Sequence, residues 1–428
     1  LSFTPSAYII PHHCVRKDES STTKLRTVSN ASFKPNETST SLNDILHSGP
    51  TLQKDIAEII TNFRLKSIVV CADIKQMYRN VEVAQEHRKL QHIFYRSDPD
   101  GPIDEYELNV LTYRVTSSAF LAQRVLLQLV NDEGQNYPLA SNAIANQTFV
   151  DDICVSVDTT AQALRLQQEL TELLKLGGFE LHKWASNSQT VLQNVPLDHR
   201  EQPLHIHSND EHAMKVLGLQ YNPENDTFSY TIRLNPIAYT KRSMLSEMSK
   251  IYDILGWITP STFYVKHLMQ SLWLLGLGWD DPLPSEICSK WTNFISTLPQ
   301  FSDLKISRHI PISSANFIQI IGFCDASEKG YAANLYVRTE NDDGVRIQLL
   351  KAKSKVAPLK VISVPRLELC AAQLLTQLLT STKNVVNTIQ PQNIILFSDS
   401  SVVLSWLSIP PYKLKTFVAN RVVDILEE

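Results

Sequence analysis

The sequence has 428 residues, a length that corresponds to roughly two to three domains. Hydrophobic residues make up 43% and charged residues 20%, a balance typical of chains that bury substantial cores. The net charge of −4 excludes a general electrostatic attraction to nucleic acid, so binding of that kind would need local basic patches. The six cysteines have no paired spacing, which argues against a zinc module and a disulfide framework. No apolar stretch approaches the roughly 18 residues of a membrane span.

The N-terminal half predicts irregular segments followed by strands and helices. Residues up to about Asn62 are polar and rich in Ser and Thr, and the segment "SIVVCADIK" (Ser67–Lys75) is typical of a strand. The segment "SAFLAQRVLLQLV" (Ser118–Val130) has helical spacing, and "TFVDDICVSV" (Thr148–Val157) alternates as a strand does. A further helix then ends at a Gly-Gly pair, and "FELHKW" (Phe179–Trp184) predicts another strand.

The C-terminal half predicts a hairpin, a helical middle and a second mixed region. "MKVLGLQYN" (214–222) and "TFSYTIRL" (227–234) read as the two strands of the hairpin. Residues from about 235 to 304 are helical and Trp-rich, and a third region begins near Ile310 with strands, the helix "VPRLELCAAQLLTQLLTST" and the strand "NIILFSDSS". Strands interleaved with helices indicate an α/β or α+β protein.

Two adjacent aspartates lie inside an apolar strand pattern. Asp151 and Asp152 fit the turn of a hairpin, and Asp73 ends another strand. Three carboxylates gathered without partners are unfavourable, whereas oxygen-only ligands suit Mg²⁺. Two ions about 3.5–4 Å apart can support phosphoryl or nucleotidyl transfer. For the dipeptide alone a solvated turn is the better interpretation, but the apolar residues on both sides favour a site.

These motifs resemble a known family, the reverse transcriptases of the Bel/Pao group of LTR retrotransposons. "FVDD" is similar to their Y/F-x-D-D hairpin and "ADIKQMY" to their first aspartate motif. Five further stretches resemble the family and occur in the family's order along the chain: "YIIPHHCVRKDESSTTKLRTVSNAS", "SLNDILHSGPTLQKD", "GGFELHKWASNS", "VLGLQYNPENDTF" and "LGWITPSTFYVK". The resemblance covers nearly the whole chain.

The resemblance implies a role for each matching polymerase residue. Asp73, Asp151 and Asp152 would hold two Mg²⁺ ions, and Tyr78 would exclude the 2′-hydroxyl of the incoming nucleotide. The remaining matches would bind the triphosphate or lie near the leaving pyrophosphate: Lys24, Arg26 and Lys183. Without the family, Tyr78 is as well explained as a core aromatic, and the three basic residues are better explained as solvated surface groups.

A second carboxylate set occurs in the C-terminal region. Asp325 ends a strand, Glu368 lies on a helix and Asp399 ends another strand. Singly, each is better explained as a strand end, helix cap or exposed side chain. Together the order resembles the RNase H region of Bel/Pao polyproteins, which implies a second pair of Mg²⁺ ions for cleaving the RNA of a hybrid. An "NPAD"-like motif is missing before Glu428, so we expect a truncated domain with weak or absent hybrid cleavage.

Several positions depart from the family pattern. In "YRVTSSAF", Arg114 replaces a glycine and Ala119 replaces a proline. Glycine at such a place commonly allows a positive φ or a close backbone approach. Other departures occur elsewhere: Ser29, Asn30 and Ile254. We therefore expect the fold to survive and the polymerase rate to be impaired.

The sequence hypothesis is thus an α+β chain with reverse-transcriptase fingers and palm (1–235), a helical thumb and connection (236–309) and an incomplete RNase H-like α/β domain (310–428). Its expected partners are an RNA template, a DNA primer or RNA:DNA hybrid, and dNTPs, with no membrane. The expected location is intracellular: cytoplasm, virus-like particle or nucleus. In the helical middle, Lys241, Arg242, Lys250 and Lys266 either bind phosphates or form a solvated face.

Two other functions remain open from the sequence. One is a catalytically impaired relic or domesticated nucleic-acid-binding protein, which Arg114 and Ala119 favour and the intact carboxylates oppose. The other is a cellular DNA-templated polymerase, which the fused RNase H-like region makes less favourable. The missing initiator Met and the abrupt end at Glu428 indicate a piece of a longer reading frame.

Overall fold

The structure is a computed structural model that describes residues 6–16, 25–201, 214–232 and 239–427. The chain divides into two compact units, each built from several segments. Unit 1 comprises Leu1–Lys54, Val70–Val155 and Thr160–Glu201. Unit 2 comprises Asp55–Val69, Ser156–Thr159 and Gln202–Glu428. The sequence predicted three consecutive functional segments (1–235, 236–309 and 310–428), whereas these units are defined by compactness alone. The functional segments stay a prediction.

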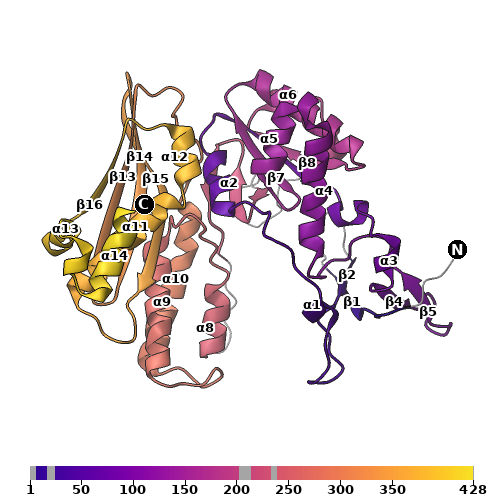
Figure 1. Ribbon diagram of the computed structural model, residues 1–428, viewed down its shortest axis with the longest axis horizontal. Helices are drawn as coiled ribbons and strands as arrows, with labels where there is room; N and C mark the ends of the chain where they lie inside the picture. Colours follow the sequence, from indigo (N-terminus) through magenta and orange to yellow (C-terminus); the bar gives the residue numbers. More distant parts are fainter. Residues whose placement is uncertain (1–5, 17–24, 202–213, 233–238, 428) are drawn as a thin grey trace. The chain divides into compact units, whose positions relative to one another are not determined.

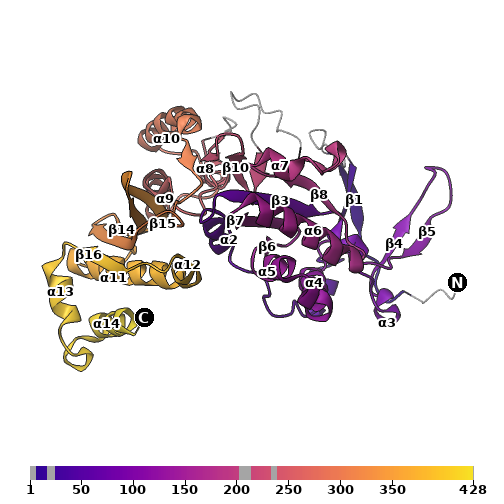
Figure 2. The ribbon, with the colours of Figure 1, turned by 90° about the horizontal axis from the view of Figure 1, so that it is seen from above.

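A four-stranded sheet with the order β6-β7-β3-β8 forms the centre of unit 1 (Figure 2). Its strands are β3 (Ile68–Ile74), β6 (Thr148–Phe149), β7 (Asp152–Val157) and β8 (Leu181–Ala185). The apolar, β-branched residues of β3 and β7 are buried almost throughout, which is why both segments form inner strands. The strands and the aspartate hairpin that the sequence predicts are therefore present.

Three helices that contact one another cover one face of this sheet (Figure 2). They are α4 (Ser118–Glu133), α5 (Pro138–Asn146) and α6 (Thr160–Leu176). The nearly buried carboxylate of Glu169 on α6 accepts a 2.7 Å hydrogen bond from the backbone N–H of Leu139 at the start of α5. A carboxylate is favourable there because the first N–H groups of a helix have no partners within the helix. Pro138 occupies the first turn, where its missing N–H costs nothing.

Smaller elements complete unit 1. Two hairpins pair β1 (His12–Arg16) with β2 (Leu25–Ser29) and β4 (His92–Tyr95) with β5 (Asp104–Glu107). Unit 1 also contains four short helical segments: α1 (Leu42–Ile45), the 3₁₀ turn η1 (Met77–Asn80), α3 (Gln85–Arg88) and α7 (Gln189–Leu192). The turn η1 follows β3 directly, so it holds Tyr78 close to the end of that strand.

Unit 2 begins with α2 (Ile56–Phe63) and contains a small sheet of order β12-β11-β10-β9. Its strands are β9 (Met214–Val216), β10 (Leu219–Asn222), β11 (Thr227–Ser229) and β12 (Ile306–Ser307). The sequence predicted one strand over 214–222, and this was wrong. A tight turn divides the segment, with positive φ at Leu217 (48°) and Gly218 (87°). Positive φ at both central residues of a two-residue turn reverses the chain into an antiparallel pair.

Two buried arginines, Arg64 and Arg308, lie where the segment between α2 and β3 meets this small sheet. Arg308 is completely buried and donates hydrogen bonds to the carbonyls of Phe63, Lys66 and Ser67. Its guanidinium also forms an ion pair with Asp226. Nearby, burial and the charge of Arg308 lower the pKa of Arg64 to about 9. Buried charges are tolerated only when they are paired and hydrogen-bonded, so this set fixes the local backbone strongly.

The remaining part of unit 2 is helical and then mixed. Its first helices are α8 (Lys241–Met248), α9 (Thr259–Leu274) and α10 (Ser285–Thr297). A second sheet of order β15-β14-β13-β16 follows, with β16 parallel to β13 and the other pairs antiparallel. Its strands are β13 (Phe317–Ser327), β14 (Gly330–Asn341), β15 (Gly344–Val356) and β16 (Asn393–Ser398). The helices around it are α11 (Val364–Thr380), α12 (Lys383–Ile389), α13 (Ser401–Leu407) and α14 (Thr416–Leu426).

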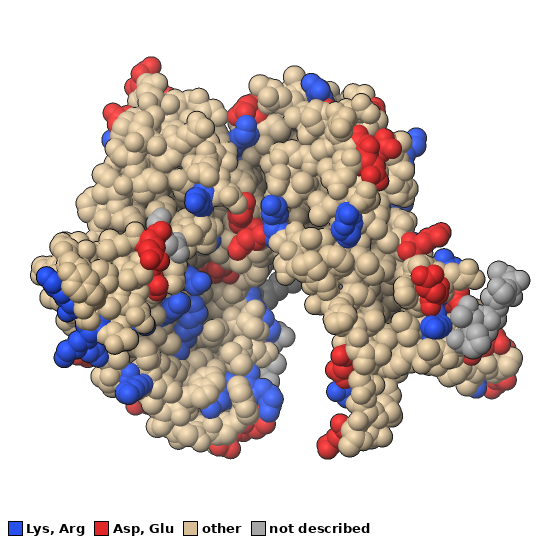
Figure 3. Space-filling view, viewed as in Figure 1, with Lys and Arg blue, Asp and Glu red and all other residues tan. Residues whose placement is uncertain are grey.

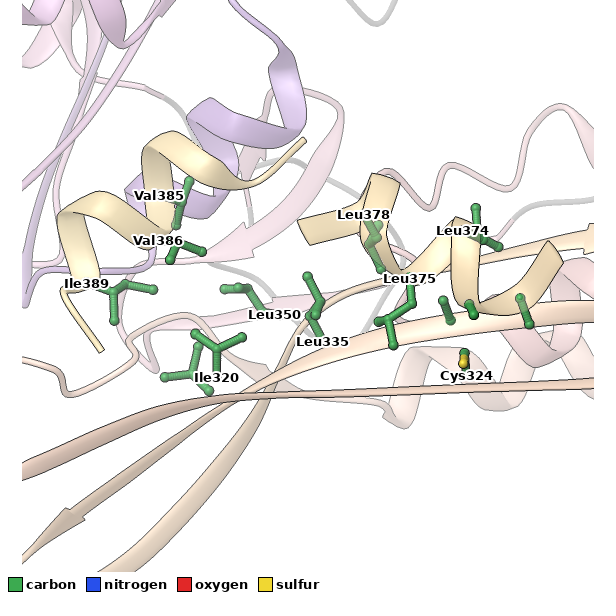
Figure 4. Close-up of a cluster of buried hydrophobic side chains, with 14 of the residues drawn as sticks. Ile320, Cys324, Leu335, Leu350, Leu374, Leu375, Leu378, Val385, Val386 and Ile389 are labelled. Carbon is green, nitrogen blue, oxygen red and sulfur yellow. The ribbon is translucent and has the colours of Figure 1, made fainter. Parts of the chain in front are cut away.

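Leucine side chains of α11 form the core of this second sheet (Figure 4). Leu375 and Leu378 lie over Ile320, Leu335 and Leu350 of the strands, and all five are at most 3% exposed. Each fully buried leucine stabilises the fold by about 1.5–3 kcal/mol through removal of apolar area from water. Figure 4 shows side chains of α12 extending the same core. In the described part of the chain, no helix is long and apolar enough to cross a bilayer.

Candidate functional site

The β6–β7 hairpin lies beside β3 and brings the first carboxylates together. Phe149 and Asp152 pair across a two-residue turn, so Val150 and Asp151 form its tip. Ile74 donates its backbone N–H to the carbonyl of Asp151 over 2.8 Å, which places Asp73 next to the turn. Val150 has φ of +58°, a strained conformation for a β-branched residue. Strain of this kind persists only where the surrounding structure enforces it, and here it orients the two aspartates.

The pKa values of these aspartates show how close their charges are. Burial raises the pKa of Asp151, and the charge of Asp73 raises it further. Burial, Asp151 and Asp73 together raise the pKa of Asp152 to about 7. Each carboxylate therefore disfavours ionisation of the next one. The negative charges of Asp73, Asp151 and Asp152 repel one another when ionised, and a bound cation would reduce that repulsion.

Asp73 is held by two basic side chains of β8. Lys183 Nζ lies 2.7 Å from one carboxylate oxygen and His182 Nε2 lies 2.8 Å from the other. Burial alone would raise the pKa of Asp73, but these two hydrogen bonds outweigh burial and lower that pKa. Burial opposes the charge of Lys183 in the same way, yet the hydrogen bond to Asp73 raises the lysine pKa overall. Asp73 and Lys183 thus stay charged together.

A β-bulge explains how two consecutive residues reach one carboxylate. Between Cys71 and Asp73 the register with β8 shifts, and Lys183 has φ of +53°. A regular strand would direct residues 182 and 183 to opposite faces, whereas a bulge re-aims one of them. The sequence motifs predicted Lys183 at this site but not His182 or the half-buried Glu201. Burial raises the pKa of Glu201, and the charge of Lys183 opposes that shift.

The carboxylates of Asp73, Asp151 and Asp152 are the type of ligand that a divalent cation prefers. Their positions, as the structure describes them, do not form a metal site. Oxygen-only donors from adjacent strands are the ligands that Mg²⁺ prefers. Among the described residues, however, no group of three or more His, Cys, Asp or Glu side chains is placed to hold a metal ion. The oxygens of Asp73 are engaged by Lys183 and His182. Holding an ion there would require Asp73 to exchange these partners for the metal.

Two tyrosines lie beside the carboxylates. The ring centroids of Tyr78 and Tyr113 are 4.6 Å apart. Burial raises the pKa of each phenol, and the charge of Asp151 raises both further. The charges of Arg79 and, to a smaller extent, Arg26 on β2 act in the opposite direction on Tyr113. Lys24 lies outside the described residues.

Arg114 occupies a backbone conformation that favours glycine. Its φ is +66°, in the left-handed region where side chains with a Cβ are disfavoured. Asn43 holds the segment by donating to the Arg114 carbonyl over 3.0 Å and accepting from the Thr116 N–H over 2.9 Å. An arginine therefore holds, with strain, a backbone conformation that glycine adopts readily.

The second carboxylate set surrounds Cys324 at one end of the β13–β16 sheet. Asp325 ends β13, Glu368 lies in the first turns of α11 and Asp399 follows β16. Burial raises the pKa of the Cys324 thiol to about 11, and the charges of all three acids contribute to that shift. The Ser400 hydroxyl donates to Glu368, whereas Asp325 and Asp399 are exposed. The charges of all three acids thus act on the same thiol, although in the described part of the chain they do not form a group placed to hold a metal ion.

The basic residues of the helical middle have different environments. Lys241 is nearly buried over the rings of Trp273 and Trp279 and donates to the Leu277 carbonyl. The other paired residues form ion pairs with neighbouring acids: Arg242 with Asp280 and Lys250 with Glu247. These three stabilise unit 2 internally. Lys266 instead lines a cavity.

Known proteins resemble this chain in two ways, through one family model and through the fold of solved structures. Residues 240–400 match the family described as the Pao retrotransposon-like RNaseH-like domain. No curated protein sequence matches the chain. The foamy viral protease-reverse transcriptase in complex with an RNA/DNA hybrid has a similar fold, with TM-score 0.58 and 14% identity over 99% of this chain and 50% of that one.

A second foamy viral structure shows the same likeness. The protease-reverse transcriptase dRH in complex with double-stranded DNA has TM-score 0.61 and 15% identity over 99% of this chain and 64% of that one. The chain therefore spans 50% and 64% of the lengths of these two proteins, and identity this low shows the fold alone. The family match therefore places a Pao retrotransposon-like RNaseH-like domain within residues 240–400, and the two likenesses show that the chain has a fold similar to these viral proteins.

Proposed function

We propose that the chain is an RNA-directed DNA polymerase of a retrotransposon, with an RNase H-like region that acts on RNA:DNA hybrids. The observation that carries the proposal is the convergence of Asp73, Asp151 and Asp152 on β3 and the adjoining hairpin, with pKa values that reveal their mutual repulsion. The similar folds support it, because both foamy viral proteins were captured with nucleic acid.

The proposed reaction extends a primer by one deoxynucleotide at a time. The 3′-oxygen of the primer attacks the α-phosphorus of a dNTP, a P–O bond forms, and the bond to pyrophosphate breaks. Two Mg²⁺ ions held by Asp73, Asp151 and Asp152 would activate the attacking oxygen and stabilise the leaving one. The same pair of roles is proposed for Asp325, Glu368 and Asp399, where a water oxygen would attack a phosphorus of the RNA strand and the ribose 3′-oxygen would leave.

The other side chains have binding roles in this proposal. Lys183 supplies positive charge beside Asp73, where the leaving pyrophosphate develops negative charge. Tyr78, supported by Tyr113, would face the sugar and exclude a 2′-hydroxyl. Lys24 and Arg26 would bind the triphosphate. Fingers and palm (1–235), thumb and connection (236–309) and RNase H-like domain (310–428) are the corresponding segments, and the proposed location is intracellular: cytoplasm, virus-like particle or nucleus.

Primer extension on a homopolymer RNA template with Mg²⁺ tests the polymerase directly. We expect extension by the unaltered chain and its loss in Asp73→Asn, because one metal-binding carboxylate is removed. Asp198→Asn is the matched control, since Asp198 is 81% exposed in the same unit. Equal extension by Asp73→Asn and the control would overturn the proposal.

One observation favours a second candidate, a nucleic-acid-binding protein with impaired catalysis. Arg114 holds a positive φ at the position where the resembling motif has glycine. If the unaltered chain binds a hybrid but does not extend it, and Arg114→Gly restores extension, the impairment lies at this residue. Binding without extension in both proteins would favour the non-catalytic function.

A further inference from the structure

A cavity of about 460 Å³ lies within unit 2, and none of the six proposed catalytic carboxylates lines it. Helix α9, the edge strand β15 and the C-terminal part of α11 form its walls. The N–H of Ala352 donates to the Leu255 carbonyl over 2.8 Å and fixes β15 against the loop before α9. The cavity therefore has a defined wall of backbone on that side.

Three lysines from two elements converge on this cavity. Lys266 comes from α9, and Lys351 and Lys353 come from β15. Burial lowers the pKa of Lys266 and of Lys351; the charges of Asp253 and Asp55 partly oppose these shifts, and the charge of Lys353 adds to both. The charge of Lys353 thus acts on both Lys266 and Lys351, and all three side chains line the same cavity. Figure 3 shows Lys and Arg side chains gathered around α9 on this face of unit 2.

The acids that line the cavity do not neutralise this charge with close ion pairs. Asp253 accepts from the Tyr230 hydroxyl over 2.7 Å and from the Ile258 N–H over 3.0 Å. Asp55 caps α2 by accepting from the Ala57 N–H over 2.6 Å. Within the described ranges, no ion pair within 4.0 Å involves any of the three lysines. Lys351 donates a hydrogen bond to the neutral hydroxyl oxygen of Ser381 over 3.0 Å.

A buried hydroxyl in the cavity wall also has no partner. Ser354 is 6% exposed, and its Oγ makes no hydrogen bond in the described structure. A buried hydroxyl without a partner is unfavourable, so it is well explained as a donor to a bound group. Ser354 also lines a second cavity of about 280 Å³ that contains Asp325 of the second carboxylate set. The lysine cavity thus adjoins the proposed hydrolytic site through one residue.

We propose that this cavity is a phosphate-binding site in which Lys266, Lys351 and Lys353 neutralise a phosphate group and Ser354 donates a hydrogen bond to it. Phosphate carries enough negative charge and acceptor oxygens to satisfy three ammonium groups and a hydroxyl together. The phosphate belongs either to the backbone of a nucleic acid bound along unit 2, which rests on the proposed function, or to a small free compound such as pyrophosphate.

Two binding measurements on the full chain separate these sources. Pyrophosphate binding is followed by isothermal titration, and RNA:DNA hybrid binding by fluorescence anisotropy at several salt concentrations. Lys353→Gln is the principal variant, because Lys353 is exposed and its loss leaves the core intact. Lys355→Gln is the matched control, on the same strand, exposed and outside the cavity.

We expect Lys353→Gln to weaken one of the two ligands about 3- to 10-fold more than Lys355→Gln does. If the ligand is the hybrid, its salt slope also falls by about one, as expected for one lost phosphate contact. Lys353→Arg should restore binding, and Ser354→Ala should weaken it with little change in melting temperature. Pyrophosphate affected alone assigns the site to small phosphates, and the hybrid affected alone assigns it to the nucleic-acid backbone.

Identical behaviour of Lys353→Gln and Lys355→Gln with both ligands overturns the proposal. That failure is distinct from failure of the polymerase, because primer extension by the unaltered chain is measured separately. A chain that extends primers but shows no difference between these variants loses the phosphate site alone. A chain that extends nothing but binds pyrophosphate through Lys353 keeps it.

Discussion

The two carboxylate sets use the same residue types in different electrostatic settings. Around Asp151 and Asp152, burial and mutual repulsion raise carboxyl pKa values, and two basic residues hold Asp73. In the second set, Asp325 and Asp399 are exposed, so water screens their charges. The first set is therefore a buried cluster of interacting carboxylates, whereas two of the three acids in the second set face solvent.

Replacing one acid in either set should abolish one proposed activity, primer extension or hybrid hydrolysis, and spare the other. This is the largest expected effect. Asp151→Asn should lower primer extension on the order of 10³-fold while leaving hybrid hydrolysis unchanged, because it removes a proposed metal ligand from the first set only. Glu368→Gln should do the reverse. Gel assays with a labelled primer and a labelled RNA strand measure both. Loss of both activities from either substitution would contradict two separate sites.

Lys183→Met should reduce primer extension by about 10- to 100-fold. The substitution removes a charge-assisted hydrogen bond of 2.7 Å to Asp73 and the positive charge next to the leaving group. Lys175→Met, an exposed lysine on α6, is the control. Single-turnover primer extension gives the rates, and equal rates for the two variants would remove Lys183 from the site.

The acid–base behaviour of Asp152 gives a stability effect of intermediate size. With a folded-state pKa of about 7, the folded protein keeps a proton that the unfolded chain releases near the ordinary value of 3.8. Ionisation in the fold therefore costs stability increasingly as the pH rises from about 4 to 7. In Mg²⁺-free buffer, Asp152→Asn should gain on the order of 2 kcal/mol more at pH 8 than at pH 4.

Chemical denaturation at the two pH values measures this difference, and Asp198→Asn is again the exposed control. Added Mg²⁺ should reduce the gain at pH 8, because the ion stabilises the ionised carboxylate of the unaltered chain. A gain from Asp152→Asn that is the same at both pH values would show that repulsion between the carboxylates is not its cause.

Arg114→Gly should produce the smallest effect, a stabilisation of about 0.5–1 kcal/mol. Glycine removes the strain at a φ of +66°, although its freedom in the unfolded chain offsets part of the gain. Arg114→Lys keeps a Cβ and should give no gain. Thermal unfolding compares the two variants. A stabilisation by lysine equal to that by glycine would attribute the effect to side-chain chemistry rather than to the backbone.

The sequence predicted the positions of the acids better than the environment that holds them. Asp73 and Asp151 were predictable because each ends or interrupts an apolar strand, and neighbouring strands bring such ends together. His182 was not predictable, because regular alternation directs it away from Lys183 and only the bulge in β8 overrides that pattern. Burial of charged groups likewise depends on contacts between distant segments.

The fold shows the same limit. Long apolar patterns predicted β3, α4, α6 and α11 correctly, since their periodicity reflects a buried face. The segment 214–222 was misread as one strand, because the left-handed conformation of Leu217 has no signature in leucine itself. Lys241 was equally ambiguous, since its position over Trp273 and Trp279 depends on how α8 and the end of α9 pack.

Binding of a divalent ion to the first carboxylate set is the most direct test of the central claim. Titration of Mn²⁺, followed by electron paramagnetic resonance, should show binding at pH 8 that is lost in the Asp151→Asn, Asp152→Asn double variant and kept in Asp198→Asn. Mn²⁺ binding that survives the double substitution unchanged would contradict the account, because the gathered carboxylates would then not be what holds the metal.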